Sequence, residues 1–158
     1  MSSGCHGNSC ESRTPGPVAR TCPKCGQRGK SVSVLTVKSL VRQHTRVPVD
    51  SYLFCRTPDC DLVYFSAGAI FRKRDLKVRV GLKEHEDPIP LCYCFDYSRA
   101  DIRNDIETKG STTILERIKA EVGAGYCACE VKNPSGDCCL GDVTRATREA
   151  KRMVTVGT

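Results

Sequence analysis

The segment YCACEVKNPSGDCC, residues 126–139, contains four cysteines: Cys127, Cys129, Cys138 and Cys139. Thiolates are soft metal ligands, so four of them close together could form a complete metal site. They could also form two disulfides, or supply half of a larger site. The segment LCYCF offers the other half, because Cys92 and Cys94 stand two positions apart.

The number of cysteines decides little by itself. Twelve in a chain of 158 residues would also suit a disulfide framework, but such frameworks are typical of secreted domains. The start of the sequence has neither the basic lead nor the apolar stretch of a secretory signal. No run approaches the roughly 18 apolar residues of a membrane helix. We therefore expect a cytoplasmic protein with no membrane span, whose clustered thiols stay reduced and bind metal.

Two more cysteine pairs occur earlier in the chain. TCPKCG contains Cys22 and Cys25 with two residues between them, and FCRTPDC contains Cys55 and Cys60 with four. Zinc prefers four ligands in a tetrahedron, and two such pairs would complete it without an open position. The expected role is structural, because the metal would pin two turns of a small lobe together. A redox-active dithiol and a rubredoxin-like iron site are the alternatives.

The C-x-C segment has a different geometry. In an extended chain, residues two apart point to the same side, so Cys92 and Cys94 could hold one iron together. A 2Fe-2S cluster needs four thiolates. The second pair would then come from residues 126–139, and a helix N-terminus behind that loop would place N–H dipoles near the anionic cluster.

The elements that must position these thiols fall into three stretches. Residues 1–20 are rich in Ser, Gly and Pro and predict a flexible tail that carries Cys5, His6 and Cys10. Residues 21–84 predict a β-rich lobe, because SVSVLTV and LKVRVGL alternate. SYLF and LVYF flank the turn CRTPDC as in a hairpin, and AGAIFRKRDL could add a turn or short strand.

Residues 85–158 predict a helical lobe, with the linker KEHEDPIPL marking the change at residues 83–91. Ser98 with Asp101, and Thr113 with Glu116, could form capping boxes at two helix starts. A third helix is expected from Leu140 onward. The predicted fold class is α+β, with a small β-rich zinc-binding lobe followed by a helical 2Fe-2S-binding lobe.

Four stretches carry a family resemblance: CPKC, FCRTPDCDLVYF, LKVRVGLKEHEDPIPLCYC and CEVKNPSGDCCLGDV. Over roughly residues 21–145 they resemble the amino-terminal domain of CopZ-type copper chaperones. The C-x-C segment and the helical hairpin after it also resemble bacterioferritin-associated ferredoxin domains. The resemblance implies a zinc-binding lobe joined to a 2Fe-2S lobe.

The resemblance also implies two ligand sets. The zinc ligands would be Cys22, Cys25, Cys55 and Cys60. The cluster ligands would be Cys92, Cys94, Cys129 and Cys139. In the family pattern a cysteine stands four residues before Asn-Pro, which selects Cys129, and we take Cys139 over Cys138 as the second of an adjacent pair. Cys127 and Cys138 are then spare, although either could replace an assigned ligand.

The function implied is copper or other soft-metal handling by one-electron transfer, such as reduction of Cu(II) to Cu(I). The sequence contains no Met-x-Cys-x-x-Cys motif, with which the second domain of the family carries Cu(I). The alternative is a copper- or mercury-binding chaperone that uses Cys5, His6 and Cys10, with a structural or sensory cluster. A metal transporter or an electron-donor protein would be the partner.

Composition argues against two other classes. The formal charge of +7 would allow nucleic-acid binding. Two four-thiolate sites, each adding about −2, would lower it to about +3. We therefore expect no nucleic-acid partner. The sequence contains no phosphate-binding loop, catalytic triad or pair of catalytic carboxylates, so any enzymatic activity would be electron transfer to a metal ion.

Overall fold

The computed structural model describes residues 19–157. The first half is built on a four-stranded antiparallel sheet in the order β1-β2-β3-β4. Its strands are β1 (Lys30–Val32), β2 (Tyr52–Phe54), β3 (Leu62–Phe65) and β4 (Ile70–Arg72). The hairpin predicted around CRTPDC is confirmed, since β2 pairs with β3 and Phe54 lies opposite Tyr64. The short strand expected within AGAIFRKRDL is β4.

One predicted strand is wrong. Within SVSVLTV the strand β1 ends at Val32, and helix α1 follows (Val34–Leu40). The Ser33 side chain accepts a hydrogen bond from the Thr36 N–H at 3.2 Å and caps this helix. A serine in this position stabilises a helix start, which here outweighs the alternating pattern. The helix buries Val37 and Leu40, and Val37 packs in one hydrophobic cluster with Val63 and Tyr64 of the sheet.

The alternating segment LKVRVGL also forms no regular strand. Leu76 makes an isolated bridge to Val41, and short 3-10 turns stand on either side, η2 (Lys73–Asp75) and η3 (Gly81–Lys83). Another such turn, η1 (His44–Arg46), follows α1. Leu76 and Val80 are buried, so the alternation reflects burial of a loop rather than strand pairing.

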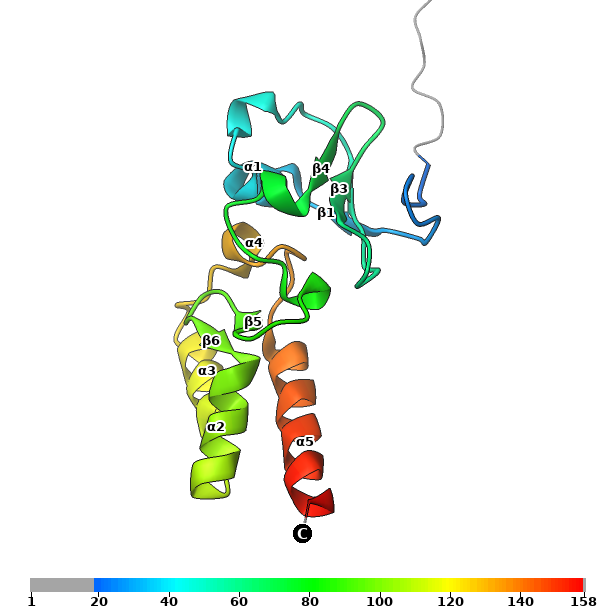
Figure 1. Cartoon of the computed structure of the whole chain (residues 1–158). Coiled ribbons are helices and arrows are strands. Elements are labelled where there is room, and N and C mark those ends of the chain that lie inside the picture. Colours follow the sequence, from blue (N-terminus) through cyan, green and yellow to red (C-terminus); the bar gives the residue numbers. More distant parts are fainter. Residues whose placement is uncertain (1–18, 158) are drawn as a thin grey trace, which may run out of the picture.

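The second half is mainly helical, with the two-stranded sheet β5 (Pro90–Cys92) and β6 (Tyr97–Ser98) at its start. Four helices follow: α2 (Arg99–Lys109), α3 (Ile114–Gly123), α4 (Cys129–Lys132) and α5 (Leu140–Val156). Figure 1 shows α2, α3 and α5 side by side, with α4 near α1 of the sheet half. The three longer helices were predicted, and the short α4 was not.

The helix caps explain these boundaries. Ser98 and Asp101 form the predicted capping box of α2, and Gly110 ends that helix with a positive φ of 75°. The box predicted for Thr113 and Glu116 is wrong, because Thr113 makes no side-chain cap. The Ile114 N–H instead donates to the Thr112 hydroxyl at 3.2 Å.

Each half of the chain has its own hydrophobic cluster. One lies between α1 and the sheet, around Val37, Val63 and Tyr64. Another lies among α2, α3 and α5, around Ile102, Ile118 and Val143. These features confirm the α+β class. No helix within residues 19–157 is both long and apolar enough to cross a membrane.

Candidate metal centres

The structure brings together one set of four thiols, which we call the four-cysteine group: Cys22, Cys25, Cys55 and Cys60. All four sulfur atoms lie within 4.8 Å of one another. The Cys22–Cys60 separation is 3.9 Å, and the Cys25–Cys55 separation is 3.7 Å. A tetrahedron with Zn–S bonds near 2.3 Å has edges of about 3.8 Å. The geometry and the chemistry of this donor set therefore fit zinc.

Two turns build this group. The first precedes β1, where the Cys22 carbonyl oxygen accepts from the Gly26 N–H at 2.8 Å and Gly26 has a φ of 73°. The second connects β2 to β3, so the hairpin holds Cys55 and Cys60 near each other. Cys25 is half-buried, and the other three cysteines are buried. A metal here would be shielded from solvent on most sides.

The thiols of this group differ in acidity. The Thr57 hydroxyl lies 3.1 Å from the Cys25 sulfur. This contact, together with the Gln27 backbone, lowers the pKa of Cys25 to about 6. Burial raises the pKa of Cys22 to about 12 and also raises that of Cys60. Metal must therefore displace protons from the buried thiols, which makes its affinity depend on pH.

The second thiol group consists of Cys92, Cys94, Cys129 and Cys139. Cys92 ends β5, Cys94 lies in the turn after it, Cys129 begins α4, and Cys139 is the N-cap residue of α5. The sulfurs of Cys94 and Cys129 are 3.6 Å apart, and Cys92 and Cys139 belong to the same buried cluster. Among residues 19–157, only the four-cysteine group has at least three ligand atoms within 4.8 Å of one another.

Cys92 and Cys94 were expected to hold one iron together, and this stays a prediction. The structure differs from the expected extended segment in one respect, because β5 ends at Cys92 and Cys94 lies in the turn after it. The Ala128 N–H donates to the Cys94 sulfur at 3.2 Å.

The second thiol group also contains one acidic thiol. Interaction with the Cys139 thiol lowers the pKa of Cys92 to about 6, and the same interaction raises the pKa of Cys139. Burial raises the pKa of Cys129 to about 12. Of the spare cysteines, Cys127 is half-buried like Cys94, and Cys138 is exposed.

The loop that carries Cys129 and Cys139 rests on the sheet half. The Tyr64 hydroxyl donates to the Pro134 carbonyl oxygen at 2.6 Å, and Lys30 donates to the Ser135 carbonyl oxygen at 3.0 Å. Asn133 accepts from the Ser135 N–H at 3.1 Å, which shapes the turn as its sequence predicted. The sheet half therefore positions two thiols of the second group.

Sequence reasoning missed two residues beside the four-cysteine group. Thr57 was treated only as part of the turn, and Lys83 as part of a charged linker. The structure places Lys83 inside the protein with its ammonium against the Cys55–Cys60 loop. Nothing in the local sequence distinguishes this lysine from the charged residues around it.

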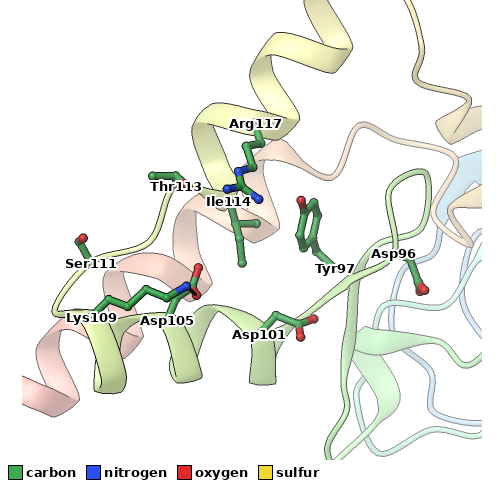
Figure 2. Close-up of a pocket in the computed structure, with 9 residues that line it drawn as sticks. All are labelled: Asp96, Tyr97, Asp101, Asp105, Lys109, Ser111, Thr113, Ile114 and Arg117. Carbon is green, nitrogen blue, oxygen red and sulfur yellow. Dashed lines mark hydrogen bonds and ion pairs between the residues drawn. The ribbon is translucent and has the colours of Figure 1, made fainter.

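A surface pocket of about 340 Å³ lies along α2 and α3, and no thiol lines it (Figure 2). Two of its three carboxylates have local roles: Asp105 pairs with Lys109 at 2.7 Å and accepts from the Thr112 hydroxyl at 2.9 Å. Asp101 caps α2. The thiol groups therefore remain the candidate sites.

Comparisons with known proteins support this assignment. Residues 19–77 match the family model of the CopZ zinc binding domain. The X-ray structure of the Archaeoglobus fulgidus CopZ N-terminal domain is similar, with a TM-score of 0.65 and 35% sequence identity. The match covers 79% of this chain and 95% of that domain. The chain belongs to the CopZ N-terminal domain family.

The CopZ relationship extends to a curated full-length relative. The copper chaperone CopZ of Archaeoglobus fulgidus is 38% identical over 120 residues, which are 75% of this chain. The chain spans 57% of that chaperone's length. The CopZ resemblance stated from sequence is confirmed, and the four-cysteine group lies within the segment that matches the zinc binding domain.

Proposed function

We propose that this CopZ-type chain is a copper-handling protein with a structural zinc ion bound by Cys22, Cys25, Cys55 and Cys60. The main support for this proposal is that the four sulfur atoms lie within 4.8 Å of one another, inside the segment that matches a zinc binding domain. Four thiolates fill the coordination shell of zinc. Zinc therefore holds the lobe together, and copper is handled by other residues.

Zinc analysis of the isolated protein tests the structural part of this proposal. We expect about one zinc per chain. Replacing Cys55 by Ser should abolish tight zinc binding, whereas replacing the exposed Cys138 by Ser should not. A zinc content unchanged by Cys55→Ser would contradict the ligand assignment.

The chaperone hypothesis is better supported than electron transfer, because the similar full-length protein is named a copper chaperone. Its candidate copper ligands here are Cys5, His6 and Cys10, which lie outside the described residues. Two thiols and an imidazole suit Cu(I) by ligand softness. Cys5 and Cys10 are the residues to test first.

Competition with a chromophoric Cu(I) chelator tests this copper site. We expect the Cys5→Ser/Cys10→Ser double variant to lose tight Cu(I) binding, while Cys138→Ser retains it. Zinc content serves as the folding control in both variants. Unchanged Cu(I) affinity in the double variant would exclude the tail as the copper carrier.

Electron transfer is a second candidate function, supported by the two thiol pairs of the second group. Cys92, Cys94, Cys129 and Cys139 would hold a 2Fe-2S cluster, which would supply one-electron chemistry such as reduction of Cu(II) to Cu(I). The N-terminus of α5 begins beside Cys139 and would favour a negatively charged group.

Anaerobic purification followed by iron and acid-labile sulfide analysis tests this second candidate. About two irons and two sulfides per chain, with an EPR signal after reduction, would support it. The reduced protein should then convert Cu(II) to Cu(I) as that signal disappears. Absence of sulfide would overturn the cluster and leave the chaperone hypothesis intact. A cytoplasmic location and a transporter or electron-donor partner stay predictions.

A further inference from the structure

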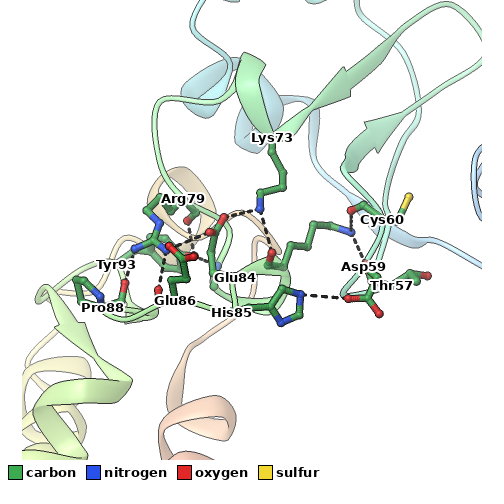
Figure 3. Close-up of polar contacts among 12 residues, drawn as sticks. Thr57, Asp59, Cys60, Lys73, Arg79, Glu84, His85, Glu86, Pro88 and Tyr93 are labelled. Carbon is green, nitrogen blue, oxygen red and sulfur yellow. Dashed lines mark hydrogen bonds and ion pairs between the residues drawn. The ribbon is translucent and has the colours of Figure 1, made fainter.

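Lys83 is the buried charged residue of the described chain, with only 1% of its surface exposed. Its ammonium donates to the Thr57 carbonyl oxygen at 2.7 Å and to the Cys60 carbonyl oxygen at 3.0 Å. Both carbonyls belong to the loop that presents Cys55 and Cys60. Figure 3 shows Thr57 and Cys60 of this loop, and nearby it shows Glu84 with its two cations, Lys73 and Arg79.

The partners of this ammonium are neutral. Within residues 19–157, none of the ion pairs formed by lysine or arginine includes Lys83, whereas its neighbour Glu84 pairs with Lys73 at 2.9 Å and with Arg79 at 3.1 Å. Burying a positive charge without a carboxylate is costly unless another negative group offsets it. Glu84 therefore pairs with other cations, and the negative charge that offsets Lys83 must come from another group.

The four-cysteine group can supply that negative charge. Four thiolates around one Zn(II) carry a net charge of about −2. The Cys60 residue links the two features directly, since its carbonyl oxygen accepts from Lys83 while its sulfur belongs to the group. We propose that Lys83 is a positioning residue for the metal: it offsets thiolate charge and fixes the loop that presents Cys55 and Cys60.

Lys83 also contacts Thr57, which lies beside a third thiol of the group, that of Cys25. The Thr57 carbonyl oxygen accepts from Lys83, and its hydroxyl lies 3.1 Å from the Cys25 sulfur. Movement of Thr57 would therefore disturb the position of the Cys25 thiol. Lys83 thus acts on both turns of the site, although it donates to none of the sulfurs.

This inference rests on the proposed zinc site, and the experiment separates the two. Zinc affinity is measured by chelator competition on the full chain and on Lys83→Met, Lys83→Gln and Lys83→Arg. The Met variant keeps the volume, the Gln variant keeps an N–H donor, and the Arg variant keeps the charge. Both neutral variants lose the positive charge that offsets the thiolates, and a charged donor bonds more strongly than a neutral one, so we expect them to bind zinc roughly ten- to hundred-fold more weakly. The Arg variant should recover most of the affinity.

Lys77→Met is the matched control, because the Lys77 ammonium also donates to a carbonyl oxygen, that of Ser39 at 2.8 Å, but near the protein surface. Its zinc affinity should equal that of the unmodified protein. Folding is checked in each variant by circular dichroism, and the coordination geometry by the absorption of bound Co(II). The Co(II) spectrum should keep the features of four sulfur ligands in every folded variant.

Zinc affinity within threefold of the unmodified protein in either folded neutral variant would overturn the role of Lys83. Failure of the unmodified protein to bind zinc would instead overturn the proposed site. If both neutral variants unfold, the unmodified protein itself provides the test. The ammonium nitrogen signal of Lys83, observed by NMR in the unmodified protein, should shift when zinc is added after chelator treatment. An unchanged signal would contradict the proposal.

Discussion

The hydroxyl oxygen of Tyr93 accepts a hydrogen bond from the Gly81 backbone N–H at 2.8 Å. The same hydroxyl donates to the Arg79 carbonyl oxygen at 2.8 Å. Burial raises the pKa of Tyr93 to about 12, so the phenol keeps its proton in neutral solution. Tyr93 stands between Cys92 and Cys94, and Gly81 begins the turn that ends at Lys83. This contact therefore connects the two thiol groups.

Replacing Tyr93 by Phe removes both hydrogen bonds and keeps the ring. We expect the free energy of unfolding to fall by about 1–3 kcal/mol, because the Gly81 N–H loses a partner that little else can replace. Urea denaturation of the reduced protein measures the change. Tyr126→Phe is the control, since Tyr126 is 71% exposed. Equal stability of the two variants would show that the Tyr93 hydroxyl has no structural role.

Gly81 itself tolerates no side chain. A Cβ atom placed on this residue would lie 1.9 Å from the Pro90 carbonyl oxygen, which is backbone and cannot move aside freely. Gly81→Ala should therefore destabilise the protein severely, by about 3 kcal/mol or more, through a backbone clash. Gly141→Ala should do the opposite and stabilise α5 by about 0.5–1 kcal/mol.

Gly141 is the matched control because a Cβ atom added to it would have no other atom within 4 Å. Thermal unfolding monitored by circular dichroism distinguishes the two substitutions by the sign of the change in Tm. A Gly81→Ala variant that melts at the temperature of the unmodified protein would mean that the η3 turn is not packed against Pro90.

The four thiols of residues 126–139 should respond differently to replacement by Ser. Cys129 and Cys139 are buried and paired with Cys94 and Cys92. We expect their single variants to lose the visible spectrum of any bound iron–sulfur cluster. The Cys127→Ser and Cys138→Ser variants should keep it. Loss of the spectrum in Cys138→Ser with retention in Cys139→Ser would reverse the assignment of the adjacent pair.

Sequence spacing predicted the parts of these sites that depend on local structure. The hairpin around CRTPDC brings Cys55 and Cys60 together because strand pairing and turn residues are short-range signals. The C-x-x-C turn at Cys22 likewise carries its own geometry. The Ser98 capping box could be predicted for the same reason, since donor and acceptor stand three residues apart.

Long-range contacts could not be predicted in this way. The role of Lys83 depends on where a loop 23 residues away turns its carbonyl oxygens. The pairing of Cys94 with Cys129 depends on how α2 and α3 return the chain to β5. Within SVSVLTV, the Ser33 cap and the burial of α1 against the sheet outweighed the alternating pattern.

Glu84 should make the stability of the protein depend on pH. Burial alone would raise the pKa of this carboxyl, but its hydrogen bonds with Lys73 and Arg79 lower it overall. The unfolded value is about 4.3. A carboxyl whose pKa is lower in the folded state stabilises the fold above the unfolded value, and this contribution is lost as the pH falls through the folded pKa. We therefore expect Glu84→Gln to cost about 1 kcal/mol at pH 7, and the difference to shrink below pH 4.

Urea denaturation of the reduced full chain at both pH values measures this difference, with a chelator present so that metal loss does not contribute. Glu149→Gln is the matched control, because Glu149 lies exposed in the interior of α5 and its replacement removes the same charge. That variant should follow the unmodified protein at each pH. A Glu84→Gln difference of the same size at pH 7 and below pH 4 would mean that the two cations do not lower the pKa of Glu84. Backbone contacts alone, without the ion pairs of Glu84, would then hold the η3 turn in place beside Arg79.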